Sequence, residues 1–284
     1  GVAATILQVV LNLYLTVCRI GKTTALQRQM IGGTSNSIGM AIAPLVISYL
    51  IFHGTPLHDI VTKQFIIPLI ILILIMLIIT LLVGKTQMPS IDNVRQAPGE
   101  KFDKSVWSFR NLKLGVWGIF FYVGIEVAVG ANVNMYASEL GGSFASNATH
   151  MAALYWGLLL LGRFLGSFIK QVPSEKQLVI ASIGAIVLLV LAMLTANPWI
   201  LTLIGFFHSI MWPAIFTLAT DQLGKYTTKA SGVLTMGVIG GGIIPLLQGI
   251  FADVMGGNWL WTWLLVIAGE AYILYYGLNG YKQH

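Results

Sequence analysis

Polar side chains within long apolar runs are the residues of this chain whose types and spacing suit chemistry. Gln8 and Asn12 are four positions apart, so a helix presents both amides on one face. An amide both donates and accepts hydrogen bonds, which suits the hydroxyl groups of a sugar. The alternative is a hydrogen bond to a neighbouring helix within a membrane. Gln8 and Asn12 are therefore candidate ligands for a polyhydroxylated solute.

Glu126 is a carboxyl in the middle of an apolar run, with no positive charge three or four positions away on either side. Three roles stay open for it: a proton carrier, a ligand for a sugar, or a neutral acid bonded to another helix. Asn132 and Asn134 lie farther along the same run and are further candidate ligands. Gly124 and Gly130 would let this helix bend or pack closely.

His208 and Trp212 are also four positions apart, so one helix face would carry a polar ring and an aromatic plate. Aromatic rings stack on the apolar faces of sugars, while amides such as that of Gln248 bind the hydroxyls. The alternatives are a structural histidine and a packing or interfacial tryptophan. No neighbouring residues suggest a metal site, and none is predicted.

The elements that must position these residues are membrane-spanning helices. Only 9% of the 284 residues are charged, 56% are hydrophobic, and the mean hydropathy is +0.82, all unlike a soluble domain. The net charge of +6 indicates basic loops rather than nucleic-acid binding, and the lone Cys18 is interpreted as a small apolar residue. We predict an all-α membrane protein with spans at 1–17, 33–53, 64–84, 113–137, 151–170, 177–195, 198–220, 230–252 and 259–280.

The basic residues predict the orientation of these spans. All of the 16 Lys and Arg residues except Lys63 fall at alternate connections or at the C-terminus. The positive-inside rule therefore places the C-terminus in the cytoplasm and the start of the chain outside. The one long charged connection is 85–112, within which Ser105–Leu114 is predicted to form a short interfacial helix.

A nine-span chain that starts outside suggests three further spans before Gly1. Twelve spans would then divide six and six about the charged connection, as in transporters built from two halves with a midplane site. We therefore predict a partial N-terminal half at 1–84, a cytoplasmic linker at 85–112 and a six-helix half at 113–284.

Six strings in order sharpen this interpretation. They are LQVVLNLY from Leu7, TSNSIGMAIAP from Thr34, FFYVGIEVAVG from Phe120, GRFLGS from Gly162, FFHSIMWPAIFTLA from Phe206 and GGGIIPLLQGIFAD from Gly240. Together they closely resemble the fucose–galactose–glucose:proton symporter family of the major facilitator superfamily, particularly its glucose/galactose branch. The resemblance covers nearly the whole chain as helices four to twelve. It implies a bacterial inner-membrane sugar symporter with the first three helices missing.

Several further expectations rest on that resemblance. Asn36 lies in a helix that lines the family's cavity, although the family often has Gln-x-x-Asn-Ser where this chain has Gly33-Thr-Ser-Asn-Ser. The fucose branch has Glu where this chain has Gln8, so glucose or galactose is expected ahead of fucose. Arg163 and Asp221 match the cytoplasmic gate region, and simple snorkelling of these charges is the alternative.

The predicted function is proton-coupled monosaccharide transport by alternating access, with a lipid bilayer and no cofactor or nucleic acid as partner. An enzyme is not expected, because no HExxH zinc motif and no paired nucleophile occur. Gly240-Gly241-Gly242 lacks a following Lys and predicts close helix packing rather than a phosphate loop. The alternative function is an inactive remnant or a sensor derived from a transporter. Without the first three helices the cavity would be incomplete, so the chain alone is not expected to transport.

Overall fold

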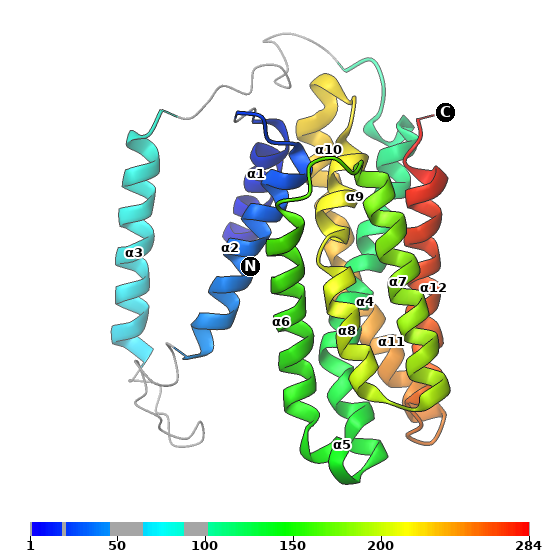
Figure 1. Ribbon diagram of the computed structural model, residues 1–284. Coiled ribbons are helices and arrows are strands. Elements are labelled where there is room, and N and C mark those ends of the chain that lie inside the picture. The colour runs from blue at the N-terminus through cyan, green and yellow to red at the C-terminus, as the bar shows by residue number, and fades with distance from the viewer. Residues whose placement is uncertain (1, 19–20, 46–64, 88–101, 284) are drawn as a thin grey trace. The chain divides into compact units, whose positions relative to one another are not determined.

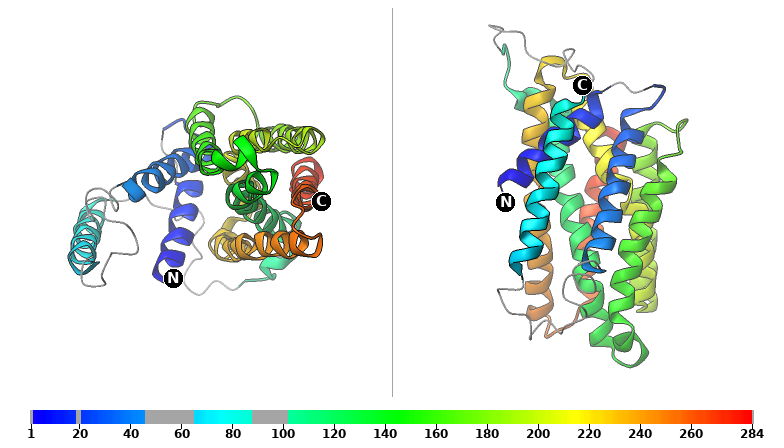
Figure 2. Two further views of the ribbon diagram at one scale, coloured as in Figure 1. Left: turned by 90° about the horizontal axis from the view of Figure 1, so that it is seen from below. Right: turned by 90° about the vertical axis from the view of Figure 1, so that its left-hand side faces the viewer.

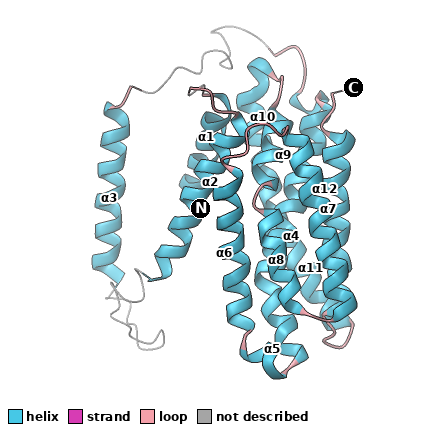
Figure 3. Ribbon diagram, in the orientation of Figure 1, coloured by secondary structure: helices cyan, strands magenta, loops and turns pink. Residues whose placement is uncertain are grey.

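The computed structural model describes residues 2–18, 21–45, 65–87 and 102–283. Every regular element in these ranges is a helix (Figure 3), which confirms the predicted all-α class. The chain divides into two compact units, residues 1–34 with 91–284, and residues 35–90.

The first two helices are α1 (Val2–Val17) and α2 (Ala25–Leu45). The predicted start of the second span at residue 33 is wrong, because a capping box begins the helix earlier. The Thr24 hydroxyl accepts from the backbone N–H of Gln27, and the Gln27 amide oxygen accepts from the N–H of Thr24, both at 3.1 Å. Arg28, counted as a loop residue, therefore lies within α2.

Helix α3 (Ile66–Lys85) belongs to the second unit. Twenty residues with a rise of 1.5 Å each match the thickness of the bilayer hydrocarbon. None of its residues is buried by the other described residues. Because its only charge is Lys85 in the last turn, lipid is the environment that suits this surface.

The helices that follow residue 102 pack around α4, which contacts α6, α8, α9, α11 and α12 (Figures 1 and 2). Helix α7 lies against α8 and α12. The bounds are α4 (Arg110–Leu140), α5 (Gly142–Ser146), α6 (Ala148–Gly166), α7 (Ser174–Thr195), α8 (Pro198–His208), α9 (Met211–Thr220), α10 (Thr227–Thr235), α11 (Gly240–Val254) and α12 (Trp263–Tyr275).

Glycines allow the close approach of α4 to its neighbours. A Cβ atom on Gly240 would collide with the backbone carbonyl of Phe120, and one on Gly124 would collide with Ile244. Gly130 lies against the indole ring of Trp156. The close packing expected for these glycines is therefore what the structure shows, whereas Gly242, for which it was also expected, has open space at its Cβ position.

The predicted interfacial helix at Ser105–Leu114 is wrong. Only Val106–Ser108 form a single 3-10 turn, and Phe109 is extended before α4 begins at Arg110. The ring of Phe109 packs on Tyr226 with centroids 5.0 Å apart. Arg110 and Lys113 thus belong to the first turns of a long helix.

Two predicted spans are interrupted helices. The span at 198–220 breaks at Ser209–Ile210, between α8 and α9. Pro213 has no N–H to bond the carbonyl of Ser209 four residues earlier, which accounts for the break. The span at 230–252 changes to a 3-10 turn at Met236–Ile239 before α11.

Five segments of the described ranges are long and apolar enough to cross a membrane. They are Ile66–Lys85, Arg110–Leu140, Ser174–Thr195, Pro198–Thr220 and Gly224–Val254, and Thr5–Val17 is a shorter apolar helix. The predicted connection at 54–63 and residues 88–101 of the predicted linker at 85–112 lie outside the described residues. The count of nine spans and the division into halves stay predictions.

Candidate functional site

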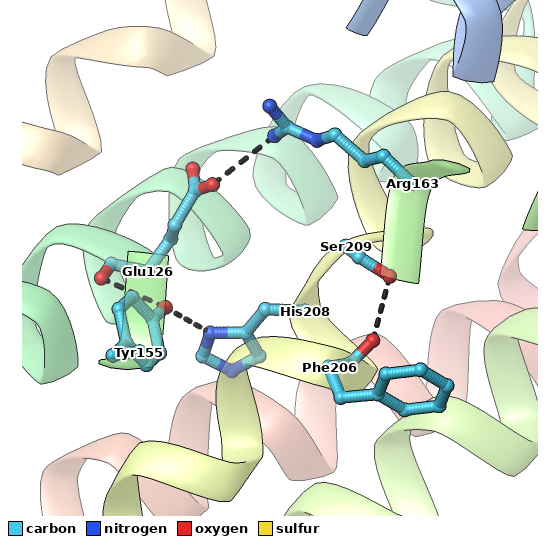
Figure 4. Close-up of polar contacts among 6 residues, drawn as sticks. All are labelled: Glu126, Tyr155, Arg163, Phe206, His208 and Ser209. Atoms are coloured by element: carbon cyan, nitrogen blue, oxygen red, sulfur yellow. Dashed lines mark hydrogen bonds and ion pairs between the residues drawn. The ribbon is translucent and has the colours of Figure 1, made fainter. Parts of the chain in front are cut away.

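The first component of the site is an ion pair between α4 and α6. Arg163 Nη2 lies 3.3 Å from Glu126 Oε1, and the two side chains keep 11% and 13% of their surface exposed. Figure 4 shows the guanidinium reaching from the last turns of α6 toward the carboxyl on α4. Glu126 has no positive charge three or four positions away on its own helix, and the packing of a second helix supplies one.

The second component is a fully buried chain of three side chains from α6, α8 and α12. The Tyr155 hydroxyl lies 2.6 Å from Nδ1 of His208, and Nε2 of His208 lies 2.6 Å from Oε1 of Glu270. The side chains of His208 and Glu270 have no exposed surface. The Tyr155 hydroxyl also lies 3.0 Å from the backbone carbonyl of Glu126 (Figure 4). This contact joins the buried chain of three side chains to the ion pair.

The end of α8 fixes the position of His208, its last residue. The helix stops there because Pro213 follows, and the Ser209 hydroxyl donates to the Phe206 carbonyl at 2.6 Å (Figure 4). Gly205 packs against the backbone of Tyr155, where a Cβ atom would collide with its carbonyl. This close approach of α8 to α6 brings the imidazole to the tyrosine hydroxyl.

The position of His208 does not suit its predicted role as a sugar ligand. Both ring nitrogens are occupied by protein partners, so in this conformation neither is available to a ligand. The prediction that His208 and Trp212 share one helix face is also wrong, because the helix is interrupted between α8 and α9. Trp212 instead stacks on Phe216, with centroids 6.0 Å apart, and lies 6.5 Å from the ring of Tyr122.

The third component is a chain of neutral polar groups between α4, α11 and the turn before α12. The Asn132 amide donates to Gln248 Oε1 at 2.9 Å, and the Gln248 amide donates to the Thr262 hydroxyl at 3.0 Å. Two predicted ligands are therefore bonded to each other, and Gln248 is fully buried. Asn134, two residues farther along α4, has a buried side-chain oxygen with no hydrogen-bond partner in the described part of the chain.

The remaining sequence-predicted candidates are on α1, on α2 and at the end of α9. Gln8 is exposed on α1 and Asn12 on the same helix is buried. Asn36 is exposed and belongs to the other unit. Asp221 is exposed at the end of α9, whereas Arg163 pairs with Glu126. The two predicted gate charges are therefore not brought together in this conformation.

Glu270 and Tyr155 were not among the predicted site residues. Glu270 carried a usable signal, since an ionisable residue within an apolar span is a functional candidate by default. Tyr155 had none, because a tyrosine in an apolar helix is ordinary. Only the packing of α6 on α8 shows that its hydroxyl bonds the histidine.

Comparison with known proteins matches residues 27–245 to the Major Facilitator Superfamily. A glucose/galactose transporter of Brucella abortus is 34% identical over 288 residues, covering 98% of this chain and 69% of that protein. A Helicobacter pylori protein named for glucose/galactose transport is 35% identical over 263 residues, covering 87% of this chain and 64% of its own length. The chain thus spans about two thirds of the length of these relatives, whose names are those of transporters and not of enzymes.

Solved structures show the same fold. Two structures of FucP, a fucose:proton symporter of Escherichia coli, match with TM-scores of 0.81 and 0.80 at 23% identity. Each match covers 96% of this chain and 72% or 73% of the other, and the first is in the outward conformation. With its apolar helices, the chain is an integral membrane protein that belongs to the Major Facilitator Superfamily, within the fucose–galactose–glucose transporter family.

Proposed function

We propose that the protein transports a monosaccharide across the bacterial inner membrane, driven by protons, by alternating access. The observation that carries the proposal is the set of polar groups inside the apolar helices of a member of this family. Ionisable residues within membrane helices mark substrate and ion pathways. Glu126 and Arg163 supply a charged pair that keeps some exposed surface, and Asn132 and Gln248 supply amides.

The proposed substrate is glucose or galactose ahead of fucose. Gln8 provides a neutral amide, and relatives at 34–35% identity are named for glucose/galactose transport. The proposed ligands are the residues predicted from the sequence other than His208, whose ring nitrogens are both bonded within the protein, with Trp212 as the stacking surface. Binding at Asn132 would require a sugar hydroxyl to replace its bond to Gln248. In this proposal the C-terminus lies in the cytoplasm and Asp221 lies near it.

Uptake of labelled hexoses into proteoliposomes tests this function. Two forms are compared, the 284-residue chain and the same chain extended by any segment that its gene encodes ahead of Gly1. We expect glucose or galactose to accumulate in the extended form under an inward proton gradient, and accumulation to collapse when an uncoupler removes the gradient. The 284-residue form alone is expected to show no uptake.

Each other result has a definite meaning. Uptake that does not depend on the proton gradient would contradict proton coupling but would be consistent with sugar transport. No uptake or exchange of any hexose by the correctly inserted extended form would contradict sugar transport and favour a remnant or sensor. Loss of coupling in Glu126→Gln, with exchange retained, would place the coupled proton on Glu126, which is one of the three roles that the sequence leaves open for it.

A further inference from the structure

His208 and Glu270 form a buried acid–base pair that the proposed binding of sugar does not use. Their side chains have no exposed surface and their nearest atoms are 2.6 Å apart. The second oxygen of Glu270 has no hydrogen-bond partner among the described residues. Charged groups at such depth are costly and are retained where they move ions or protons.

The hydrogen bonds of this pair fit two protonation states. In the first, the Tyr155 hydroxyl donates to Nδ1 of His208 and Nε2–H donates to an ionised Glu270, so the group carries one negative charge. In the second, the Tyr155 hydroxyl donates to the Glu126 carbonyl, Nδ1–H donates to the tyrosine oxygen, and an added proton lies between Nε2 and Oε1. This second state is neutral overall.

Only one proton and one hydroxyl rotation separate the two states. Every heavy-atom contact on which they rest is present at 2.6–3.0 Å. No covalent bond to carbon changes, and the proton enters from water and returns to water. The group can therefore gain or lose a proton without losing a buried hydrogen bond to the histidine, which would otherwise carry a penalty.

The surrounding charges favour this pair over Glu126 as the place for an added proton. Tyr155 faces the imidazole from α6, and Tyr122 faces it from α4, with ring centroids 6.2 Å apart. The remaining charges of α4 and α6 near it are Glu126 and Arg163, which neutralise each other. Helix α7 carries Glu175 and Lys176 only in its first turn. Protonating Glu126 would leave Arg163 without its counter-ion, whereas protonating His208–Glu270 removes an uncompensated charge.

We propose that the proton that drives transport is held between His208 and Glu270. The Tyr155 hydroxyl rotates between His208 and the Glu126 carbonyl as this proton binds and leaves. This inference rests on the proposed function for its role in transport. The protonation itself does not require that the substrate be a sugar. Glu126 stays ionised, paired with Arg163, throughout the step.

The first test measures protonation without any substrate, by nitrogen-15 NMR of histidine-labelled protein. The full chain holds five histidines, and the difference spectrum against His208→Gln assigns the resonances of His208. Across a range of pH from mildly alkaline to mildly acidic, we expect His208 to change from the Nε2–H form to a form protonated at Nδ1. In Glu270→Gln, the histidine should stay neutral over the same range. Resonances of His208 that do not change in the unaltered protein would overturn the proposal.

The second test separates coupling from sugar binding in proteoliposomes that hold the extended form of the protein. Exchange of labelled for unlabelled sugar needs no net movement of protons, so Glu270→Gln should retain it. Accumulation driven by a proton gradient should fall by about tenfold or more. Tyr155→Phe should reduce accumulation in the same direction. Its matched control is Tyr276→Phe, which removes a buried hydroxyl bonded to the Asn111 carbonyl at 3.0 Å and should leave accumulation unchanged.

The outcomes distinguish this inference from the proposed function. If Glu126→Gln abolishes accumulation and Glu270→Gln does not, the pair does not hold the coupled proton and the inference is overturned, while sugar transport stands. If the extended form without substitutions exchanges no hexose, the proposed function fails and the NMR titration still decides whether the pair takes up a proton. Tyr155→Phe provides the same comparison if Glu270→Gln does not fold.

Discussion

Gly240→Ala is expected to destabilise the protein strongly, although it adds one methyl group. The added Cβ atom would meet the backbone carbonyl oxygen and carbon of Phe120 on α4, which cannot turn aside as a side chain can. Overpacking of this kind costs about 1–3 kcal/mol of unfolding free energy, and backbone collisions lie at the upper end. The measurement is the thermal unfolding midpoint of purified protein in detergent.

Gly242→Ala is the matched control, two positions along the same glycine run. Apart from the adjoining residues and backbone of its own helix, no atom of the described residues lies within 4 Å of the Cβ position there. Alanine also favours a helix over glycine by about 1 kcal/mol. We therefore expect an unchanged or slightly raised midpoint. Equal midpoints for the two variants would show that α4 and α11 do not approach each other at Gly240.

Arg163→Gln is expected to lower stability by about 3 kcal/mol, the lower end of the range for breaking a buried pair, since both partners keep some exposed surface. The loss has two causes: the missing bond, and an ionised Glu126 left without a counter-ion. The double variant Glu126→Gln with Arg163→Gln removes that stranded charge. It should be more stable than Arg163→Gln alone, as measured by a double-mutant cycle of unfolding free energies.

An exposed ion pair serves as the control for this cycle. Lys225 Nζ lies 3.1 Å from Asp103 Oδ2, and the aspartate side chain is 76% exposed. Asp103→Asn should therefore change stability by about 0–1 kcal/mol. If Arg163→Gln and the double variant are equally stable, Glu126 does not depend on Arg163 and the pairing of α4 with α6 would have to be revised. Loss of transport in Arg163→Gln with normal stability would instead indicate a direct role in the transport cycle.

The helices themselves could be predicted from local features of the sequence. Apolar runs of about 20 residues make spans, and the packing role of Gly124 and Gly240 follows from glycines that recur within such runs. The errors in the predicted helix bounds also come from features of the nearby sequence. The capping box at Thr24 and Gln27 was overlooked, so α2 was predicted to begin too late. Pro213 breaks a span that hydropathy alone shows as continuous.

The candidate site could be predicted only as separate residues. Glu126, His208 and Gln248 were singled out because polar groups in apolar helices are costly, which is a property of each residue alone. Their partners are Arg163, Glu270 and Asn132, which lie 37, 62 and 116 positions away. Helical periodicity reaches only four positions along the chain, so none of these pairs could be derived from spacing.

The amino-acid sequence by itself determined that this chain is helical, apolar along its spans, and supplied with a few polar side chains inside them. It also carries the strings by which its family was predicted and then confirmed. Only the tertiary structure decided that Glu126 is paired with a cation and that His208 is enclosed between Tyr155 and Glu270. The physical reason is that a side chain's charge and hydrogen bonds depend on which helix faces it, and small residues such as Gly205 and Gly240 set those contacts through packing between distant segments.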